Sequence, residues 1–302
     1  METNHLLSPK IVTENVNFER DNAEIIRHLD LITVHKPYMA LHSVHKHENC
    51  LFGTFPAEAH PENEIYPITI TEVGRHMAIL GSLAVAMENP VKEEHYYLAL
   101  HAEVIRHSYE ESFEKELVGK VEVTEFNRKG ATITGEVFNK KGECIFSIVV
   151  DYSTIHHRTF SRLFKDHYKP EVAVYADNPY TKEVELFDLV VSENECTASL
   201  GIVDESICTG HFHHYPALPV ARLGSAFCKL AGIHYNFLKN GGASQKYAYQ
   251  SVEMTAYFLP FEGEEVFIKS QVTQRDDKGY AFTTTAFNRE AKEIAELKSI
   301  II

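Results

Sequence analysis

The sequence has no tryptophan, few cysteines and a deficit of cationic side chains over its 302 residues. The cysteines are odd in number, widely spaced and contain no Cys-x-x-Cys pair, which argues against a disulfide framework and indicates reduced core thiols. They are Cys50, Cys144, Cys196, Cys208 and Cys228. Lys and Arg total 29 against 43 Asp and Glu, a formal charge of −14. Nucleic acids bind basic surfaces through their phosphates, so we expect no nucleic-acid partner for this acidic chain.

Long hydrophobic runs are also missing. No apolar run approaches the roughly 20 residues needed to span a bilayer. The first residues lack the basic-then-apolar pattern of a secretory signal. We therefore expect a cytoplasmic protein without a membrane span. With 44% hydrophobic and 24% charged residues, the chain has enough apolar side chains to bury a large core.

Residues 210–232 constrain function more than any other stretch. Gly-His-Phe at 210–212 ends a predicted strand and is followed by Pro216 and Pro219. Each proline fixes its own backbone and disfavours helix in the residue before it, so a helix is predicted to begin at or just after Pro219. Gly232 is its predicted terminator. The predicted helix has apolar residues at three- and four-residue steps, which indicates a buried face: Leu223, Ala226, Phe227 and Leu230.

This segment has the groups needed to act on a carbonyl. The first amides of a helix lack intrahelical acceptors and could polarise a thioester carbonyl beside them. His211, just upstream, is then the natural proton shuttle. A His211-x-His213 metal pair is conceivable if the strand continues. The nearby prolines and the lack of a placed third ligand argue against it, so we expect no metal.

The spacing Gly-His-Phe-x-x-x-Pro-x-x-Pro resembles the active-site segment of the beta-hydroxyacyl carrier-protein dehydratases, which are hotdog-fold enzymes. The resemblance implies that His211 is catalytic and that no cofactor is needed. The implied substrate is an acyl group carried by coenzyme A or by an acyl carrier protein, in fatty-acid or polyketide-type metabolism. The residues expected to contact it are Gly210, Phe212, Pro219 and Gly224.

The chain departs from the dehydratase pattern in its acidic residue. The family has a carboxylic acid fourteen positions after the histidine, but Ser225 stands there, and Ser82 is its expected counterpart in the first half. The first half also has Thr54 where a histidine is expected. We therefore expect at most one site, built from His211 and the first-half helix. Its possible supporting residues are Glu72, Arg75, His76 and Ser82.

The chain reads as two copies of one unit. Leu80-Gly81-Ser82 is echoed by Leu223-Gly224-Ser225, and the strand at 50–55 by 206–212. Val-Thr at 123–124 and at 272–273 each precede a Lys-Gly turn, and Phe-Asn follows at the same distance in both halves. An insertion of roughly fourteen residues, 57–70, distinguishes the first copy.

Runs rich in beta-branched and aromatic residues follow each predicted helix and predict strands. The first set is 95–105, 117–124, 131–138 and 143–153, and the second is 246–258, 265–274, 280–288 and 293–302. The predicted fold is α+β, a double hotdog in which each unit wraps an antiparallel sheet around one helix. We expect a first unit at 1–155, a linker at 156–182 and a second unit at 183–302, acting as a pseudo-dimeric monomer or as a homodimer.

Three function classes remain open. The leading one is a 3-hydroxyacyl-thioester hydro-lyase that resembles the dehydratases. The second is a thioesterase or an acyltransferase, including enzymes that resemble the A-factor-synthesis hotdog proteins, in which Ser82 and Ser225 would orient a carbonyl or water. The third is a non-catalytic acyl-binding protein. The fold alone does not decide between them.

Overall fold

A single antiparallel sheet of twelve strands organises the computed structural model. The structure describes residues 18–59, 63–65, 68–109, 116–171, 173, 175, 177–276 and 279–302. The strand order is β1-β2-β4-β5-β6-β3-β9-β12-β11-β10-β8-β7. The strands are β1 Ser43–His47, β2 Cys50–Pro56, β3 His95–Arg106, β4 Glu116–Phe126, β5 Gly130–Phe138, β6 Cys144–His156, β7 Phe187–Val191, β8 Glu195–Ile202, β9 Tyr249–Ala256, β10 Glu265–Asp276, β11 Gly279–Phe287 and β12 Glu293–Ile301.

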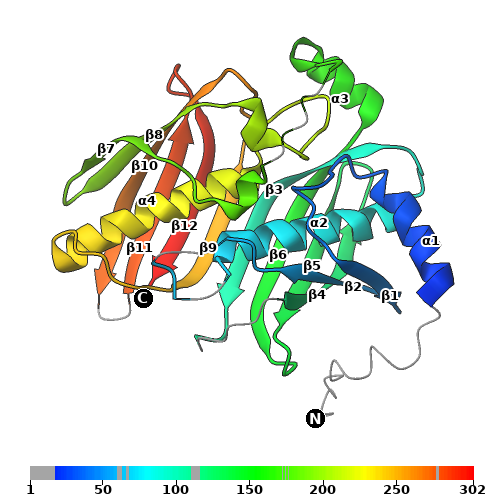
Figure 1. The fold of residues 1–302 in the computed structure, drawn as a ribbon, viewed down its shortest axis with the longest axis horizontal. Coiled ribbons are helices and arrows are strands. Elements are labelled where there is room, and N and C mark those ends of the chain that lie inside the picture. The colour runs from blue at the N-terminus through cyan, green and yellow to red at the C-terminus, as the bar shows by residue number, and fades with distance from the viewer. Residues whose placement is uncertain are drawn as a thin grey trace.

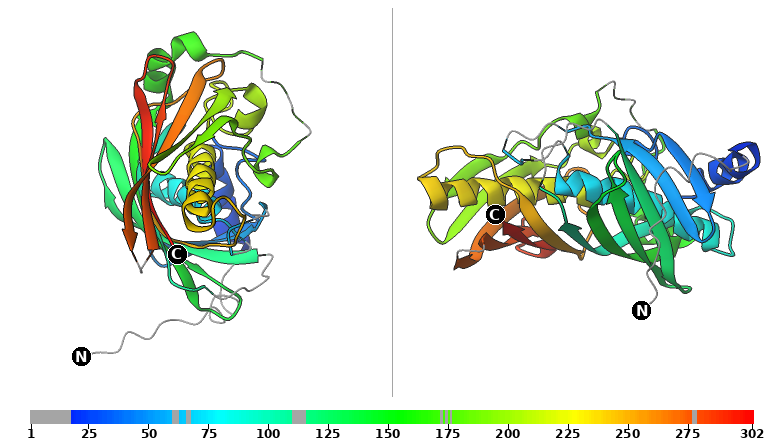
Figure 2. Two further views of the ribbon diagram at one scale, coloured as in Figure 1. Left: turned by 90° about the vertical axis from the view of Figure 1, so that its left-hand side faces the viewer. Right: turned by 90° about the horizontal axis from the view of Figure 1, so that it is seen from below.

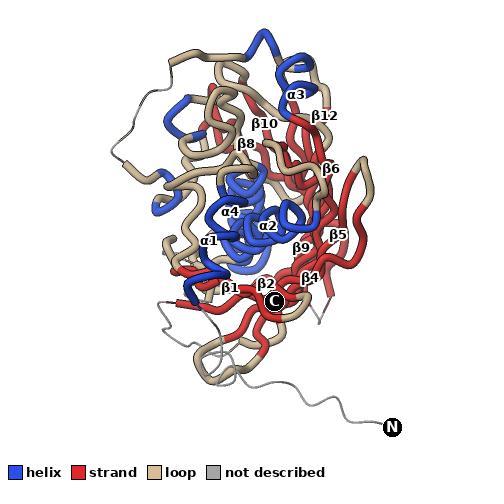
Figure 3. Tube along the Cα trace, turned by 90° about the vertical axis from the view of Figure 1, so that its right-hand side faces the viewer, coloured by secondary structure: helices blue, strands red, loops and turns tan. Residues whose placement is uncertain are grey.

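The two long helices lie on one face of this sheet (Figure 1). The two long ones are α2, Ile70–Glu88, and α4, Val220–Asn240, and the shorter ones are α1, Phe18–Leu29, and α3, His157–Leu163. Figure 1 shows α2 and α4 nearly end to end across the sheet, and the sheet curves around them in Figures 2 and 3. No helix in the described part of the chain is long and apolar enough to cross a membrane.

The two halves join where β3 pairs with β9. The pairing is antiparallel and places Glu103 opposite Glu253. Because these are central strands, the sheet runs without a break from one half into the other. This is the predicted α+β architecture, with one long helix held against the sheet in each half.

The start of α4 is as predicted, and its end is not. The helix begins at Val220 with Pro219 as its N-cap. It continues past Gly232 to Asn240 and ends at Gly241, whose φ of 64° is the left-handed conformation favoured for glycine. Gly232 lies inside the helix because Tyr247 packs against it, and a Cβ there would overlap the tyrosine hydroxyl.

All eight predicted strands are present as β3 to β6 and β9 to β12. Strands β1, β7 and β8 and helices α1 and α3 were not predicted from the sequence. Strand β8 pairs with β10 as β2 pairs with β4, so β8 is the counterpart of β2. The expected match between 50–55 and 206–212 is therefore wrong. Residues Glu205–Cys208 form a short 3-10 helix, and His211 makes only an isolated bridge to Val34. Thr54 is not the counterpart of His211.

The predicted match between Leu80-Gly81-Ser82 and Leu223-Gly224-Ser225 is also wrong, because the two segments lie at different positions along their helices. Ile70 and Val220, which start α2 and α4, are 150 residues apart, and Gly130 and Gly279, which start β5 and β11, are 149 apart. Leu80 therefore lies almost three turns into its helix, whereas Leu223 lies in the first turn of α4. Gly74 and Gly224 are the equivalent pair. Ser82 and Ser225 are not equivalent, which corrects the predicted correspondence.

Gly81 sets how closely α2 approaches the sheet. A Cβ at this position would overlap the Tyr152 hydroxyl of β6, and the next nearest atoms belong to Ile133 of β5. At Gly74, on the same helix, the nearest atom to a Cβ would be Val104 Cγ2 at 3.8 Å, an ordinary contact. The two glycines of one helix therefore differ in the space around them.

We expect Gly81→Ala to lower the free energy of unfolding by about 1–3 kcal/mol, because an overpacked site forces its neighbours to shift. Gly74→Ala should leave it unchanged or raise it by up to about 1 kcal/mol through helix propensity. Urea unfolding of both variants checks this. Adding Tyr152→Phe to Gly81→Ala should recover part of the loss, and equal stabilities of the two single variants would contradict the packing described.

Candidate functional site

The first cavity surrounds His211 and has a volume of about 220 Å³. We call it the His211 chamber. It is formed by the loop before α4, the first turn of α4, the middle of α2 and the start of β3, and is lined among others by Phe212, Leu223, Ile79, Ser82 and Tyr97. Most of this lining is apolar, so the chamber suits a hydrocarbon chain better than a charged group.

His211 is held in one orientation and in one tautomer. The residue is 7% exposed, and its Nδ1 lies 3.0 Å from the carbonyl oxygen of Ala217. A carbonyl only accepts, so Nδ1 carries the proton and Nε2 keeps a lone pair. Burial lowers the pKa of His211 to about 4, opposed by the bond to Ala217. At neutral pH the ring is therefore an uncharged base.

Neighbouring rings fix the position of His211. Tyr38 meets it edge-on at 4.9 Å between centroids, and Phe212 stacks on it at 3.8 Å. Phe212 has a φ of 52°, a conformation that is uncommon for a bulky side chain and is found more often at functional sites. The backbone N–H of His35 donates to the Gly210 carbonyl at 2.8 Å and ties the loop to the segment before β1.

The four residues predicted to bind substrate divide between different roles. Phe212 lines the His211 chamber. Gly210, with a φ of 82°, packs against the backbone of residues 35–38, where a Cβ would collide. Pro219 caps α4. Gly224 lines a smaller apolar cavity between both helices and the sheet.

The polar groups of the chamber are hydroxyls and backbone amides. Ser82 Oγ and Tyr152 Oη each donate to the Ala78 carbonyl at 2.8 Å. Burial raises the pKa of Tyr38 to about 12, with Arg75 opposing, so this phenol is a weak acid. Among the described residues that line the chamber there is no Asp or Glu. The amide of Val220, which lines the chamber at the first residue of α4, has no intrahelical acceptor.

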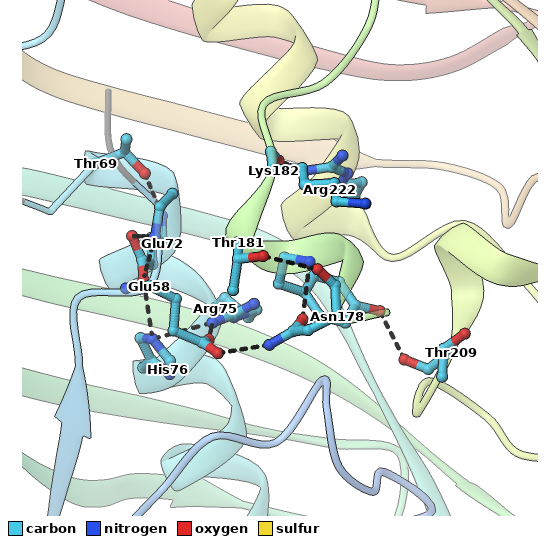
Figure 4. A network of polar contacts seen from close by, with 12 residues as sticks. Glu58, Thr69, Glu72, Arg75, His76, Asn178, Thr181, Lys182, Thr209 and Arg222 are labelled. Carbon is cyan, nitrogen blue, oxygen red and sulfur yellow. Dashed lines mark hydrogen bonds and ion pairs between the residues drawn. The ribbon is translucent and has the colours of Figure 1, made fainter. Parts of the chain in front are cut away.

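The other predicted supporting residues form a separate polar network (Figure 4). Arg75 Nη2 contacts Glu58 Oε2 and lies 3.1 Å from His76 Nε2. Glu72 accepts hydrogen bonds from the backbone amides of Glu58 and Ala59. Its Oε1 lies 3.6 Å from His76 Nε2. Burial lowers the pKa of His76 well below its usual value, with Arg75 adding to the effect.

The residues predicted to form one site therefore lie in two separate places. Of the supporting residues, only Ser82 lines the His211 chamber. Glu72, Arg75 and Ser225 line a second cavity beside α4, and His76 stacks on Phe55 at 4.6 Å. The reason is geometric: Ser82 lies about three helical turns beyond Glu72, so one chamber cannot hold both ends of α2.

Two clusters have the spacing of metal ligands. One is Glu58, Glu72 and His76, and the other is Glu93, His156 and His157; within each, one ligand atom per residue lies within 4.8 Å of the others. In the first cluster, the Arg75 guanidinium contacts both Glu58 and His76 and already supplies a cation. That network reads as a buried ion pair rather than a metal centre.

The second cavity has more charged and polar side chains in its lining than the His211 chamber, and its volume is about 300 Å³. We call it the Glu64 chamber. Glu64 is 7% exposed, and its Oε1 accepts from Arg106 Nη2 and, at 3.1 Å, from the backbone N–H of Ile70. Ser225 Oγ donates to the Ala221 carbonyl and lies 3.0 Å from Thr71 Oγ1.

Similar proteins are found by comparison of structures and not by comparison of sequences. No family model matches the sequence, and the search of curated proteins finds no match. Among solved structures, the tesB protein of Mycobacterium avium subsp. paratuberculosis aligns over 92% of this chain and 98% of its own, with a TM-score of 0.55 and 9% identity. The protein has a double hotdog fold.

Other solved structures share this double hotdog. The acyl-ACP thioesterase of Bacteroides thetaiotaomicron aligns over 84% of this chain and 98% of its own, with a TM-score of 0.54 and 13% identity. The 12:0-ACP thioesterase of Umbellularia californica aligns over 84% and 94%, with a TM-score of 0.56 and 10% identity. These similarities establish the fold. A fold does not determine the reaction, which depends on the residues of the two chambers.

Sequence reasoning missed Glu58, Glu64 and Tyr38. The first two lie in the stretch 57–70, which the repeat comparison marked as an insertion without assigning it a role. The predicted insertion is wrong: with β8 as the counterpart of β2, the second half has the longer connection, from Ile202 to Val220, so no sequence signal singled out Glu58 or Glu64. Tyr38 lies before β1 and has no motif around it, so only the fold brings it to His211.

We expect Arg75→Met to lower the free energy of unfolding by about 3 kcal/mol or more, because it leaves the Glu58 carboxylate without its buried partner. Lys182→Met removes a cation from the exposed pair with Asp177 and should leave the stability nearly unchanged. Thermal and urea unfolding compare them. Equal, small effects of both substitutions would show that the Arg75 network does not have the structural role assigned to it.

Proposed function

We propose that the protein hydrolyses an acyl thioester in the His211 chamber, with His211 as the general base. The observation that carries the proposal is the bond from His211 Nδ1 to the Ala217 carbonyl, which leaves Nε2 as a basic nitrogen in an apolar cavity. The acyl group would be carried by coenzyme A or by an acyl carrier protein, and the reaction needs no cofactor.

The steps follow from the groups present. His211 Nε2 removes a proton from a bound water, and the resulting hydroxide forms a bond to the thioester carbon. The Val220 amide, at the start of α4, stabilises the negative charge on the carbonyl oxygen. The carbon–sulfur bond then breaks, and the thiolate takes the proton back from His211. Acid and thiol are the products, and one water is consumed.

Proton balance favours hydrolysis over dehydration. Dehydration expels hydroxide, which needs a proton donor at the leaving oxygen. The described residues lining the His211 chamber include no carboxylic acid, and burial makes the Tyr38 phenol a weaker acid still. A thiolate leaves more readily because its conjugate thiol has a pKa of about 8.5. The names of the similar solved structures, which are thioesterases, also support hydrolysis.

Dehydration remains the second candidate because of the Gly-His-Phe spacing before α4. In that reaction His211 would remove the proton next to the thioester carbonyl, and Tyr38 is the nearest ring with a proton to give. Product analysis separates the two reactions, since hydrolysis releases a thiol and dehydration leaves the thioester intact.

We expect His211→Ala to lower kcat/KM for hydrolysis of a saturated acyl-CoA by about 100-fold or more, the usual contribution of a general base. Release of thiol measures the rate. His213→Ala is the matched control: this neighbouring ring contacts His35 at 5.7 Å and does not line the chamber, so its loss should have little effect. Full activity of His211→Ala would overturn the assignment.

The pH profile gives an independent check. A base must be deprotonated, and burial lowers the pKa of His211 to about 4, opposed by Ala217. The rate on a saturated acyl-CoA should therefore be flat above about pH 5 and fall only as the pH drops through 4. Measurement of kcat/KM from acid to neutral pH tests this, and a rise centred near 6.5, the value of a solvated histidine, would contradict the buried, neutral state.

A further inference from the structure

The Glu64 chamber is the pseudo-symmetric counterpart of the His211 chamber. Ala78 and Tyr97 line the His211 chamber, and Cys228 and Tyr247, each 150 residues later, line the Glu64 chamber. The shift is the one that relates the starts of α2 and α4. Each chamber therefore combines the first turn of one long helix with the middle of the other.

Glu64 is placed firmly at this second chamber. The backbone N–H of Ile65 donates to the Tyr247 carbonyl, and that of Tyr247 donates to the Asn63 carbonyl, both at 2.8 Å. These bonds hold the loop against the segment that leads into β9. Both hydrogen bonds to the Glu64 carboxylate end on Oε1. Oε2 makes no hydrogen bond to the described residues, so it is the oxygen left for a bound water.

Arg106 orients this carboxylate. Its Nε donates to the Tyr249 carbonyl at 2.9 Å, and its guanidinium lies over the Phe146 ring at 4.9 Å. Because Arg106 is 3% exposed and anchored by both contacts, its bond to Glu64 Oε1 fixes which oxygen faces the chamber. Arg106 is thus a positioning residue.

The first turn of α2 offers one amide to the chamber. The Ile70 N–H is used by Glu64, the Glu72 N–H by Thr69 Oγ1, and the Val73 N–H by the Thr69 carbonyl. The Thr71 amide has no acceptor among the described residues, and Thr71 lines the chamber. A carbonyl oxygen beside this amide would find a donor at the positive end of a helix.

We propose that the Glu64 chamber is a second acyl-thioester site, with Glu64 as its general base and an acyl group that carries a hydroxyl or keto oxygen as its substrate. The inference rests on the proposed function, because it gives the second chamber the same hydrolysis. Glu64 Oε2 takes a proton from water, the hydroxide attacks the thioester carbon, the carbon–sulfur bond breaks, and the thiolate takes the proton back. One water is consumed for each acid and thiol formed.

The polar lining indicates the class of acyl group. Thr71 Oγ1 and Ser225 Oγ lie 3.0 Å apart where the N-terminal parts of α2 and α4 meet, and both residues line the chamber. The equivalent wall of the His211 chamber is apolar, with Ile79 where the Glu64 chamber has Lys229. Hydroxyls and an ammonium group on the wall favour an oxygen-bearing acyl group over a saturated chain.

Titration of Glu64 should distinguish the two sites. Burial raises the pKa of Glu64 to about 7, while Arg106 and the Ile70 amide oppose the rise and Glu72 adds to it. A base is active when deprotonated, so this chamber's rate should rise through pH 7, where the His211 rate is flat. The charged and titratable groups coupled to Glu64 are Arg106 on β3, Glu72 on α2, Cys228 on α4, Tyr247 before β9 and Tyr249 on β9. The other charged residues that line the chamber are Arg75, Lys182, Glu183, Arg222 and Lys229.

The test uses the full chain with a saturated acyl-CoA and a 3-hydroxyacyl-CoA of equal length. In the His211→Ala background, which removes the first proposed base, we expect hydrolysis of the hydroxylated substrate to remain measurable, with a rate that rises through pH 7. Adding Glu64→Gln should lower that rate about 100-fold. Gln keeps an acceptor for Arg106 and Ile70, and the unfolding temperature of each variant confirms that it folds. Glu136→Gln, which breaks the Lys120 pair on β4 and β5 away from both chambers, is the control.

The outcomes separate the two proposals. If His211→Ala abolishes hydrolysis of both substrates, or if its residual activity is unchanged by Glu64→Gln, the second site is refuted while hydrolysis at His211 stands. If the wild type releases thiol from neither substrate, the proposed function itself fails. A residual rate without the rise through pH 7 would also count against Glu64 as the base.

Discussion

The antiparallel pairing of β3 with β9 is the constraint on which the rest of the structure depends. It joins two half-sheets into one and fixes the halves about a pseudo-two-fold axis, with Glu103 opposite Glu253. The first turns of α2 and α4 must then meet, and Thr71 contacts Ser225 across the axis. Each chamber is consequently lined by the start of one helix and by residues farther along the other.

The same scaffold buries a different titratable group in each of its two chambers. In one, desolvation keeps His211 neutral, and an apolar wall surrounds it. In the other, desolvation acts on a carboxyl group and raises the pKa of Glu64 to about 7, against the buried Arg106. Burial pushes both groups toward their uncharged forms, and this produces bases that work over different pH ranges. A chain with two fused copies can therefore vary one chamber without disturbing the other.

Local signals predicted the parts of the fold that depend on them. Alternating beta-branched strands and the prolines before Val220 indicated eight strands and the start of α4, because period and backbone restriction act over a few residues. The prediction that α4 ends at Gly232 was wrong because this glycine makes room for the Tyr247 side chain, fifteen residues later in the chain. The predicted set of residues around His211 was wrong for the same reason. Glu72 and Ser82 lie on one helix, but they line different chambers. Only tertiary structure carries that information.

The central claim is that His211 directs water to a thioester carbon. The most direct measurement is mass spectrometry of the products from saturated and 3-hydroxyacyl thioesters turned over in water labelled with heavy oxygen. The account predicts two products in equal amounts. One is a free carboxylic acid that contains one heavy oxygen atom, and the other is a free thiol. An intact enoyl thioester, formed from the 3-hydroxyacyl substrate by loss of water and dependent on His211, would contradict it and identify a hydro-lyase.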